Sequence, residues 1–351
     1  MEKIKVAVIG CGAIAKSAHI PAYTANAGCE IKYFCDILPE RADEMAEKFG
    51  GKAVYDYKEI LGDPEITAVS VCTPNNVHRH ASVDFLRAGK HVLCEKPAAR
   101  TYADALAMQQ ACRESGKILN IGVVNRFNDG VNRIKNLIDA GELGEIYHVY
   151  GSFRAPRSIP GLGGAFTTDA IAGGGVLIDW GVHFLDLIMY CLGDPAPKTV
   201  SGQAYCKLGK NMEDYTYINM WAGPPDYAGV YDVDDFITGM VRTAGPTITL
   251  NGAWAQNIFV DEMYVDFIGD KAGVRLQYGK DFVIYTAKDG ALIESSPKYK
   301  SADMYQTEID AFLNAVRTGE KLPAHIDTVI VTSRIMQALY DSSKQGREIV
   351  I

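Results

Sequence analysis

Two polar residues, Asp179 and His183, interrupt the otherwise apolar stretch VLIDWGVHFLDLI at 176–188. A spacing of four places both side chains on the same face of a helix. Burying a carboxylate and an imidazole among apolar side chains is costly unless they pair, meet water or take part in a reaction. The two residues are therefore candidates for a reaction site, and other parts of the chain must decide among these alternatives.

Lys96 lies near the end of another apolar run, HVLCEKP at 91–97. A run that is apolar on both faces is typical of a buried parallel strand. Ligands bind at the carboxyl ends of such strands, and Lys96 stands at this edge. Pro97 restricts the direction in which the chain leaves the strand. The alternative interpretation is a charged residue that only ends a strand.

A glycine-rich turn follows the first apolar run, in VAVIGCGAIAKSAHIP at 6–21. Gly10 and Gly12 allow a tight turn and a close approach to a diphosphate, and Ala15 takes the third small position. The next helix presents its free N–H groups and positive dipole end to the phosphates. Asp36 ends the second apolar run, where it would bind both ribose hydroxyls and repel a 2′-phosphate, which favours NAD over NADP. An ordinary glycine turn and loop aspartate are the alternative.

Thr73, Pro74 and Asn75 follow a further run, AVSVC, and lead into a helical pattern. Small polar residues at the carboxyl end of a parallel strand face a cofactor crevice. His78 and His80 come next, and we expect them to be exposed helix residues and not metal ligands, because no third ligand has a recognisable spacing. No metal site is predicted.

Composition limits the class of protein. The 351 residues are enough for two domains of about 150 residues each. The net charge is −8 and no basic run is present, which argues against nucleic acid and favours a small neutral or polar ligand. No export signal and no apolar run of about 18 residues are seen, so we expect a cytoplasmic protein without a membrane span. The eight cysteines form no CxxC pair, which predicts reduced thiols.

The elements that must position these residues change in kind along the chain. The first third alternates apolar runs with helical patterns that end near glycine, which predicts a parallel sheet with helical crossovers. Later runs at 199–208, 234–243, 247–256 and 263–269 follow one another without helices, which predicts a mostly antiparallel sheet. Helical patterns at 304–319 and 327–344 close the chain. The predicted domains are 1–124 and 125–351.

The order of these motifs resembles the Gfo/Idh/MocA family (glucose–fructose oxidoreductase, inositol dehydrogenase). The resemblance rests on GxGxxA with AHIP downstream, the acid after the second strand, TPNNVH, CEKPAA and the Asp-x-x-x-His helix. It implies an NAD-binding Rossmann domain followed by an α+β substrate domain on an open, mostly antiparallel sheet, with the active site between them. It also implies a homo-oligomer, a dimer or tetramer, that covers the open sheet.

The family's chemistry is hydride transfer between a secondary alcohol and nicotinamide, here on a ring hydroxyl of a sugar, glycoside or cyclitol. The resemblance makes Lys96, Asp179 and His183 the catalytic set. His183 is the first choice for the base, since an imidazole ordinarily titrates near pH ~6.5. Lys96 would stabilise negative charge on the same oxygen, and Asp179 would bind a neighbouring hydroxyl or orient the other two. Lys96 as the base is the alternative.

Further site residues follow from the resemblance. The predicted cofactor-binding residues are Gly10, Gly12, Ala13, Ile14, Ala15, Asp36, Thr73, Pro74, Asn75, His78, Glu95, Lys96 and Asn125. The predicted substrate-binding residues are Lys96, Arg126, Arg157, Asp179, Trp180 and His183, with Arg157 flexible enough to reach the nicotinamide side. The run of three glycines at 173–175 predicts either a close approach to a ligand or a flexible loop.

Two rival functions share these motifs. A redox-assisted glycosidase or lyase would oxidise a sugar carbon transiently with NAD and then eliminate, with no net NADH. A regulator that kept the fold and lost catalysis would have no need of Lys96, Asp179 and His183, all of which are present. We therefore expect an NAD-dependent oxidoreductase.

Overall fold

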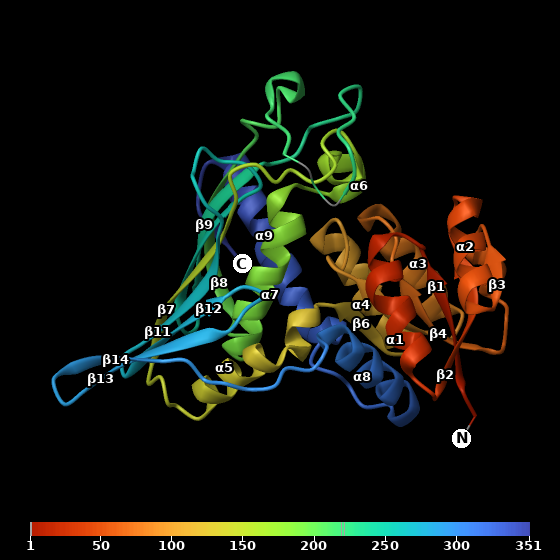
Figure 1. Ribbon diagram of the computed structural model, residues 1–351, viewed down its shortest axis with the longest axis horizontal. Coiled ribbons are helices and arrows are strands. Elements are labelled where there is room, and N and C mark those ends of the chain that lie inside the picture. Colours follow the sequence, from red (N-terminus) through yellow and green to blue (C-terminus); the bar gives the residue numbers. More distant parts are fainter. Residues whose placement is uncertain (1, 219, 221) are drawn as a thin grey trace. The chain divides into compact units, whose positions relative to one another are not determined.

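The computed structural model describes residues 2–218, 220 and 222–351, which fold into two compact units. The first unit comprises the residues up to 128 together with 302–330. The second comprises 129–301 and 331–351. The labels of helices and strands are those of Figure 1.

The first unit is built on a six-stranded parallel sheet of order β3-β2-β1-β4-β5-β6. Its strands are β1 (Ile4–Ile9), β2 (Cys29–Cys35), β3 (Lys52–Val54), β4 (Ile66–Val71), β5 (His91–Glu95) and β6 (Leu119–Gly122). Its helical elements are η1 (Ala15–His19), α1 (Ile20–Ala25), α2 (Pro39–Phe49), η2 (Tyr57–Ile60), α3 (Asn75–Arg87), α4 (Tyr102–Ser115), η3 (Val124–Phe127) and α8 (Met304–Thr318). The predicted parallel sheet is confirmed, and its edge strand β3 has only three residues, too few to form a recognisable apolar run.

Alternation along the strands divides the core of this unit into two layers. Ala7 and Ile9 of β1 belong to the cluster that includes residues of α3 and α4, whereas Val6 and Val8 belong to the cluster under α1 and α8. Successive side chains of a strand point to opposite faces, so a central strand must be apolar throughout. The end of α4 follows the predicted pattern, because Gly116 adopts the left-handed conformation there.

The return of residues 302–330 to the first unit differs from the predicted boundary, which placed them in the second domain. Ile309, Phe312 and Leu313 form an apolar stripe on α8 and are buried in the same cluster as Tyr23 of α1. Burial of each large apolar side chain contributes about 1.5–3 kcal/mol, which holds the helix on this unit. The pattern of α8 reveals an apolar face but not which domain that face will meet.

The second unit contains a nine-stranded sheet of order β14-β13-β12-β11-β7-β10-β9-β8-β15. Its strands are β7 (Ile146–Arg154), β8 (Pro197–Tyr205), β9 (Phe236–Thr243), β10 (Thr247–Ala253), β11 (Glu262–Gly269), β12 (Ala272–Gln277), β13 (Phe282–Lys288), β14 (Ala291–Ser295) and β15 (Ile349–Val350). Only the β7–β10 pairing is parallel in this described sheet, so the predicted mostly antiparallel architecture is confirmed.

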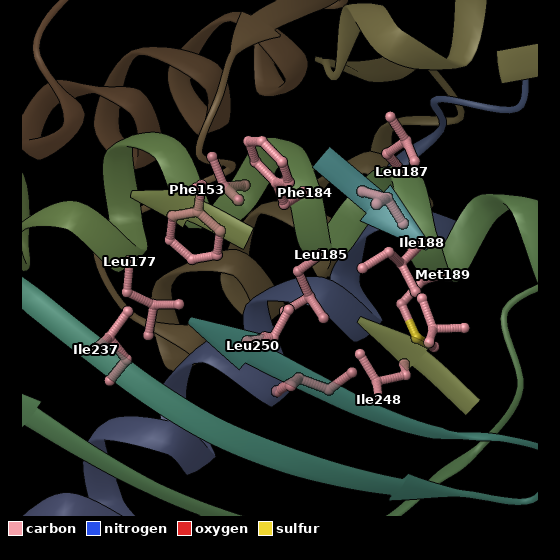
Figure 2. Packing of buried hydrophobic residues seen from close by; sticks show 14 of the residues in the cluster. Phe153, Leu177, Phe184, Leu185, Leu187, Ile188, Met189, Ile237, Ile248 and Leu250 are labelled. Atoms are coloured by element: carbon pink, nitrogen blue, oxygen red, sulfur yellow. The ribbon is translucent and has the colours of Figure 1, made fainter. Parts of the chain in front are cut away.

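Helices cover one face of this sheet. The helical elements are α5 (Asp129–Asp139), η4 (Ala165–Thr167), α6 (Asp169–Ala172), η5 (Leu177–Gly181), α7 (Val182–Cys191), η6 (Met212–Asp214) and the later part of α9 (Ile326–Gln345). Figure 2 shows apolar residues of α7, among them Leu185, Ile188 and Met189, packed over Ile248 and Leu250 of β10. This burial fixes η5 and α7, which carry the Asp179 and His183 pair.

The segment Asp169–Cys191 has the length and composition of a membrane-crossing helix, but 78% of its most apolar window is buried inside the protein. A core helix passes the same test, and the packing of α7 against the sheet accounts for its apolar character.

Candidate active site

The turn after β1 contains Gly10 and Gly12, and each position requires glycine for a different reason. Gly10 has φ +91°, and a Cβ there would lie 2.5 Å from the main-chain oxygen of Cys72. Packing between the ends of β1 and β4 therefore requires glycine at this position. A Cβ at Gly12 would meet nothing within 4 Å, so internal packing does not explain this residue. A backbone that must let a diphosphate come close does explain it, which fits the predicted cofactor.

Asp36 lies directly beside this turn. Its carboxylate accepts hydrogen bonds from the N–H of Cys11 at 2.8 Å and of Leu38 at 2.9 Å, and the residue is 8% exposed. These two bonds fix its orientation and use one acceptor site on each oxygen. Since a carboxylate has about four acceptor sites, capacity remains for two ribose hydroxyls. The position of Asp36 is thus compatible with NAD.

Thr73, Pro74 and Asn75 join the end of β4 to α3, where Pro74 stands just before the first helical residue. β4 neighbours β1 in the sheet, so these residues share its carboxyl edge with the glycine turn. The hydroxyl of Thr73 is buried and has no hydrogen-bond partner within the described part of the chain. A buried hydroxyl without a hydrogen-bond partner is unfavourable unless a bound ligand provides one, which again fits a bound cofactor.

His78 corrects a prediction, because we expected an exposed helix residue and its side chain is completely buried. One ring nitrogen lies 2.8 Å from the carbonyl of Pro97 and the other 2.9 Å from the carbonyl of Thr73. Burial lowers the pKa of this imidazole. His78 thus lies between the turn after β4 and the turn after β5, and in its neutral form it donates a hydrogen bond to one of the two carbonyls.

Lys96 follows the last residue of β5 and precedes a cis peptide bond to Pro97. Its N–H donates to one carboxylate oxygen of Glu95 at 3.0 Å. The other oxygen of Glu95 lies 2.8 Å from a ring nitrogen of His19 in η1. The second ring nitrogen of His19 lies 3.1 Å from the hydroxyl of Ser70. These polar contacts bind the helix after the glycine turn to the strand end that carries Lys96.

This buried chain of polar side chains has no signature in the local sequence patterns. His19 stands in the quoted AHIP motif, but a position 76 residues from Glu95 gives no local signal of their contact. Burial raises the pKa of Glu95, and the hydrogen bond and charge of His19, followed by the charge of Lys96, bring it below its ordinary value. Glu308 of α8 differs, because burial and the nearby charge of Glu95 hold its pKa well above the ordinary range.

Asp179 and His183 lie on η5 and α7 of the second unit. Asp179 is 8% exposed and sits in a π-helical turn, which the regular helical spacing did not predict. His183 is the only residue of α7 that is not buried, and its ring lies 6.4 Å from that of Tyr278. Trp180 is partly buried. Single π-helical turns frequently occur at functional sites.

A buried carboxylate fixes the start of this helix. Asp234 accepts hydrogen bonds from the N–H of Gly175 at 2.7 Å and of Leu177 at 3.2 Å, and from the hydroxyl of Tyr340 at 2.7 Å. A Cβ at Gly175 would clash with the main chain of Asp234, and one at Gly174 would clash with the hydroxyl oxygen of Tyr340. Close packing thus accounts for these two glycines.

Other predicted substrate residues have partners inside their own units. Arg126 is buried and donates to the carbonyl of Pro323 at 2.9 Å, close to the start of α9. Arg157 donates to the carbonyl of Gln256 at 2.9 Å and to the side chain of Asn257 at 2.7 Å. These partners lie within the second unit, and the reach of Arg157 to the nicotinamide side stays a prediction. Asn125 is buried in η3, and its contact with a cofactor stays a prediction.

All eight cysteines are free thiols, and seven of them are buried. Burial raises the pKa of Cys11 and Cys35 to about 12 each. These thiols beside the glycine turn are therefore protonated at neutral pH and are poor nucleophiles.

Comparison with known proteins matches both parts of the chain. Residues 4–123 match the family model of an oxidoreductase family with an NAD-binding Rossmann fold. Residues 131–275 match the GFO/IDH/MocA C-terminal domain. D-glucoside 3-dehydrogenase of Escherichia coli (strain K12) is 32% identical over 352 residues, which cover 99% of this chain and 97% of that protein.

Solved structures share the fold along the whole chain. Levoglucosan dehydrogenase, in complex with NADH and levoglucosan, superposes with a TM-score of 0.87 at 22% identity and covers 100% of both chains. Aldose-aldose oxidoreductase from Caulobacter crescentus, complexed with glycerol, has a TM-score of 0.83 at 24% identity with the same coverage.

Proposed function

The chain belongs to the GFO/IDH/MocA oxidoreductase family and carries its NAD-binding Rossmann domain, and we propose that it transfers hydride between a ring secondary alcohol and NAD. The substrate class is a sugar, glycoside or cyclitol. The observation that carries the proposal is the full-length similarity to a D-glucoside dehydrogenase together with Lys96 at the carboxyl end of β5.

The cofactor-binding residues proposed are those at the carboxyl edge of the parallel sheet. Gly12 lets the main chain approach the diphosphate, and Asp36 accepts hydrogen bonds from the adenosine ribose. The buried hydroxyl of Thr73 forms a hydrogen bond with the cofactor. Bound NAD supplies the hydride acceptor at its nicotinamide ring. The acid at Asp36 disfavours a 2′-phosphate, which supports NAD over NADP.

Lys96, Asp179 and His183 have separate proposed tasks. His183 removes the hydroxyl proton of the substrate as hydride leaves the carbon that bears this hydroxyl. The ammonium of Lys96 donates a hydrogen bond to the same oxygen and stabilises the negative charge that develops there. Asp179 accepts a hydrogen bond from a neighbouring hydroxyl. His183 is partly buried on an α7 whose other residues are all buried, which supports its role, because a core helix has no packing reason for an imidazole.

The test is NADH absorbance after the protein and NAD⁺ are mixed with a panel of D-glucosides, free sugars and inositols, with products identified by mass spectrometry. The similarity to D-glucoside 3-dehydrogenase makes D-glucosides the first substrates to try. We expect Lys96→Ala and His183→Ala to lose about 10²–10⁴-fold in kcat. His80→Ala, on the exposed side of α3, is the matched control and keeps wild-type activity.

A cleaved glycoside without net NADH would replace this proposal by the redox-assisted glycosidase. No product in any tube, with NAD still bound, would favour the regulator.

We also infer a homo-oligomer. The face of the nine-stranded sheet opposite the helices carries Tyr150, Tyr205 and Tyr285, which are 48%, 37% and 43% exposed. Exposed aromatic side chains on a broad sheet are typical of an interface between copies. Light scattering that finds only a monomer at micromolar concentration would reject this inference.

A further inference from the structure

The proposed chemistry does not use the polar chain behind Lys96. His19 and Glu95 are 1% and 6% exposed, and no cofactor contact explains why two titratable side chains lie this deep. Desolvation of such groups is costly, and a buried polar pair of this kind is weak evidence for stability. A second reason for keeping the pair is therefore needed.

The contacts of the Glu95 carboxylate indicate that reason. One oxygen lies 2.8 Å from His19, and the other accepts the main-chain N–H of Lys96 at 3.0 Å. Gly122, the neighbour of Glu95 across the sheet, makes room for the carboxylate, because a Cβ at Gly122 would lie 3.0 Å from its oxygen. Each oxygen of the carboxylate thus has a polar contact, and the absence of a side chain at Gly122 leaves the space that it occupies.

The chain on the other side of Lys96 is held as well. The carbonyl of Pro97 lies 2.8 Å from the ring of His78, which is anchored to the turn after β4. The N–H of Lys96 and the carbonyl of Pro97 are thus both in polar contact, so the main chain is held just before Lys96 and one residue after it. Preorganisation of this kind is what a group that stabilises developing charge requires.

We propose that Glu95, held by His19, is a positioning residue for Lys96 and not a contact to the cofactor. This inference rests on the proposed function of Lys96. The carboxylate fixes the Lys96 N–H and so aims the ammonium at the substrate oxygen. It replaces the cofactor contact that the family resemblance implied for Glu95.

Glu308 provides a matched control. It is buried at 2% exposure in the same unit, and one of its oxygens has no hydrogen-bond partner among the described residues. Glu95→Gln and Glu308→Gln make the same chemical change to two buried carboxyl groups, but only Glu95 holds Lys96.

The first experiment compares steady-state kinetics of the two variants. We expect Glu95→Gln to lose roughly 10- to 100-fold in kcat, the scale of a small misplacement of a reacting group, while the dissociation constant for NAD is unchanged. Glu308→Gln keeps the wild-type values of both. His19→Gln, whose amide can donate to Glu95, should retain more kcat than His19→Ala, and this series replaces Glu95→Gln if that variant does not fold.

The second experiment needs no substrate. In protein labelled with ¹⁵N-lysine, the amide resonance of Lys96 is assigned by its absence in Lys96→Arg. Loss of the charged acceptor in Glu95→Gln should shift this resonance, and Glu308→Gln should leave it in place. This measurement stands even if no sugar is oxidised, so failure of the positioning role and failure of the proposed function are distinguishable.

Three results would overturn the inference. The first is a wild-type kcat in Glu95→Gln, and the second is an equal loss in Glu308→Gln. The third is weakened NAD binding with kcat intact, which would make Glu95 a cofactor contact after all.

Discussion

The carboxylates of Glu95 in the first unit and Asp234 in the second occupy comparable positions and behave differently. Each is less than 9% exposed and accepts main-chain N–H groups next to a candidate catalytic segment. Each also contacts a ring-bearing side chain from a helix, His19 or Tyr340. A π-helical turn lies at both places, with His19 in η1 and Leu177 in η5.

The pKa values of these two groups shift in opposite directions. Burial raises both, but the hydrogen bond and charge of His19 and the charge of Lys96 bring Glu95 below its ordinary value. Asp234 has only uncharged donors, namely Tyr340, Gly175 and Leu177, and burial keeps its pKa raised. Hydrogen bonds from neutral donors thus leave the pKa of Asp234 raised, whereas the contact with His19 and the charge of Lys96 lower the pKa of Glu95.

The largest expected effect on stability comes from removing the paired carboxylate. Glu95→Ala leaves His19 buried without its partner, which should lower the free energy of unfolding by about 3–5 kcal/mol. Urea unfolding followed by circular dichroism measures the change. Ser70→Ala, which removes the other contact of His19 together with the 2.8 Å contact between the hydroxyls of Ser70 and Tyr23, is the control and should cost about 1–2 kcal/mol. Equal losses in Glu95→Ala and Ser70→Ala would show that the carboxylate of Glu95 contributes no more to stability than the hydroxyl of Ser70.

Asp234→Asn should have a smaller effect of about 1–2 kcal/mol. Asparagine keeps one of the two carboxylate oxygens and replaces the other by an NH₂ group, so only the main-chain N–H that faces the NH₂ group loses its acceptor. Tyr340→Phe should cost about 1 kcal/mol in the same assay. A loss in Asp234→Asn as large as that in Glu95→Ala would mean that charge, and not hydrogen bonding, anchors this centre too.

The two centres should also give opposite pH dependences. The Glu95 pKa is lowered in the folded state, so its contribution is present above the unfolded value of 4.5 and is lost as the pH falls through the folded value. The Asp234 pKa is raised, so its contribution is present below the unfolded value of 3.8 and is lost as the pH rises through the folded value.

The measurement is the free energy of unfolding of the wild type minus that of Glu95→Gln, and minus that of Asp234→Asn, at several acidic pH values. The first difference should grow as pH rises and the second should shrink. Parallel slopes would contradict the assignment of charge at the two centres.

Glu308→Gln should have the smallest effect, less than about 1 kcal/mol at pH 7, because burial and the nearby charge of Glu95 raise the pKa of Glu308 and so favour the uncharged carboxyl, which the amide resembles. The variant should become more stable than the wild type at alkaline pH, since a raised folded pKa costs stability as the pH passes it. Thermal unfolding at neutral and alkaline pH tests this, and a large loss at pH 7 would show that Glu308 is charged.

Local patterns predicted most of what lies at the strand ends. The glycine turn, Asp36, Thr73 and Lys96 follow buried strands, and the strands were recognisable because both faces are apolar. The position of Asp179 and His183 on a core helix was equally visible, since the polar residues contrast with their neighbours.

Contacts between distant residues were not predictable in this way. His19 meets Glu95 across 76 positions and Asp234 meets Gly175 across 59, and neither spacing has a local signature. His78 was expected outside because a histidine on a helix is polar, yet its ring is buried between two main-chain carbonyls, and an N–H of the ring can donate to one of them. The π-helical turns also escaped prediction, because one extra residue in a turn leaves the apolar pattern almost unchanged.

The central claim is that Lys96 and His183 act on the same substrate oxygen. The most direct test is kcat/KM for the oxidised glycoside in wild type, Lys96→Ala, His183→Ala and the double variant. Groups that act as a unit are strongly non-additive, so the double variant should lose little more than the worse single variant. Losses that multiply would show that the two residues act independently, and no loss in either single variant would contradict the account.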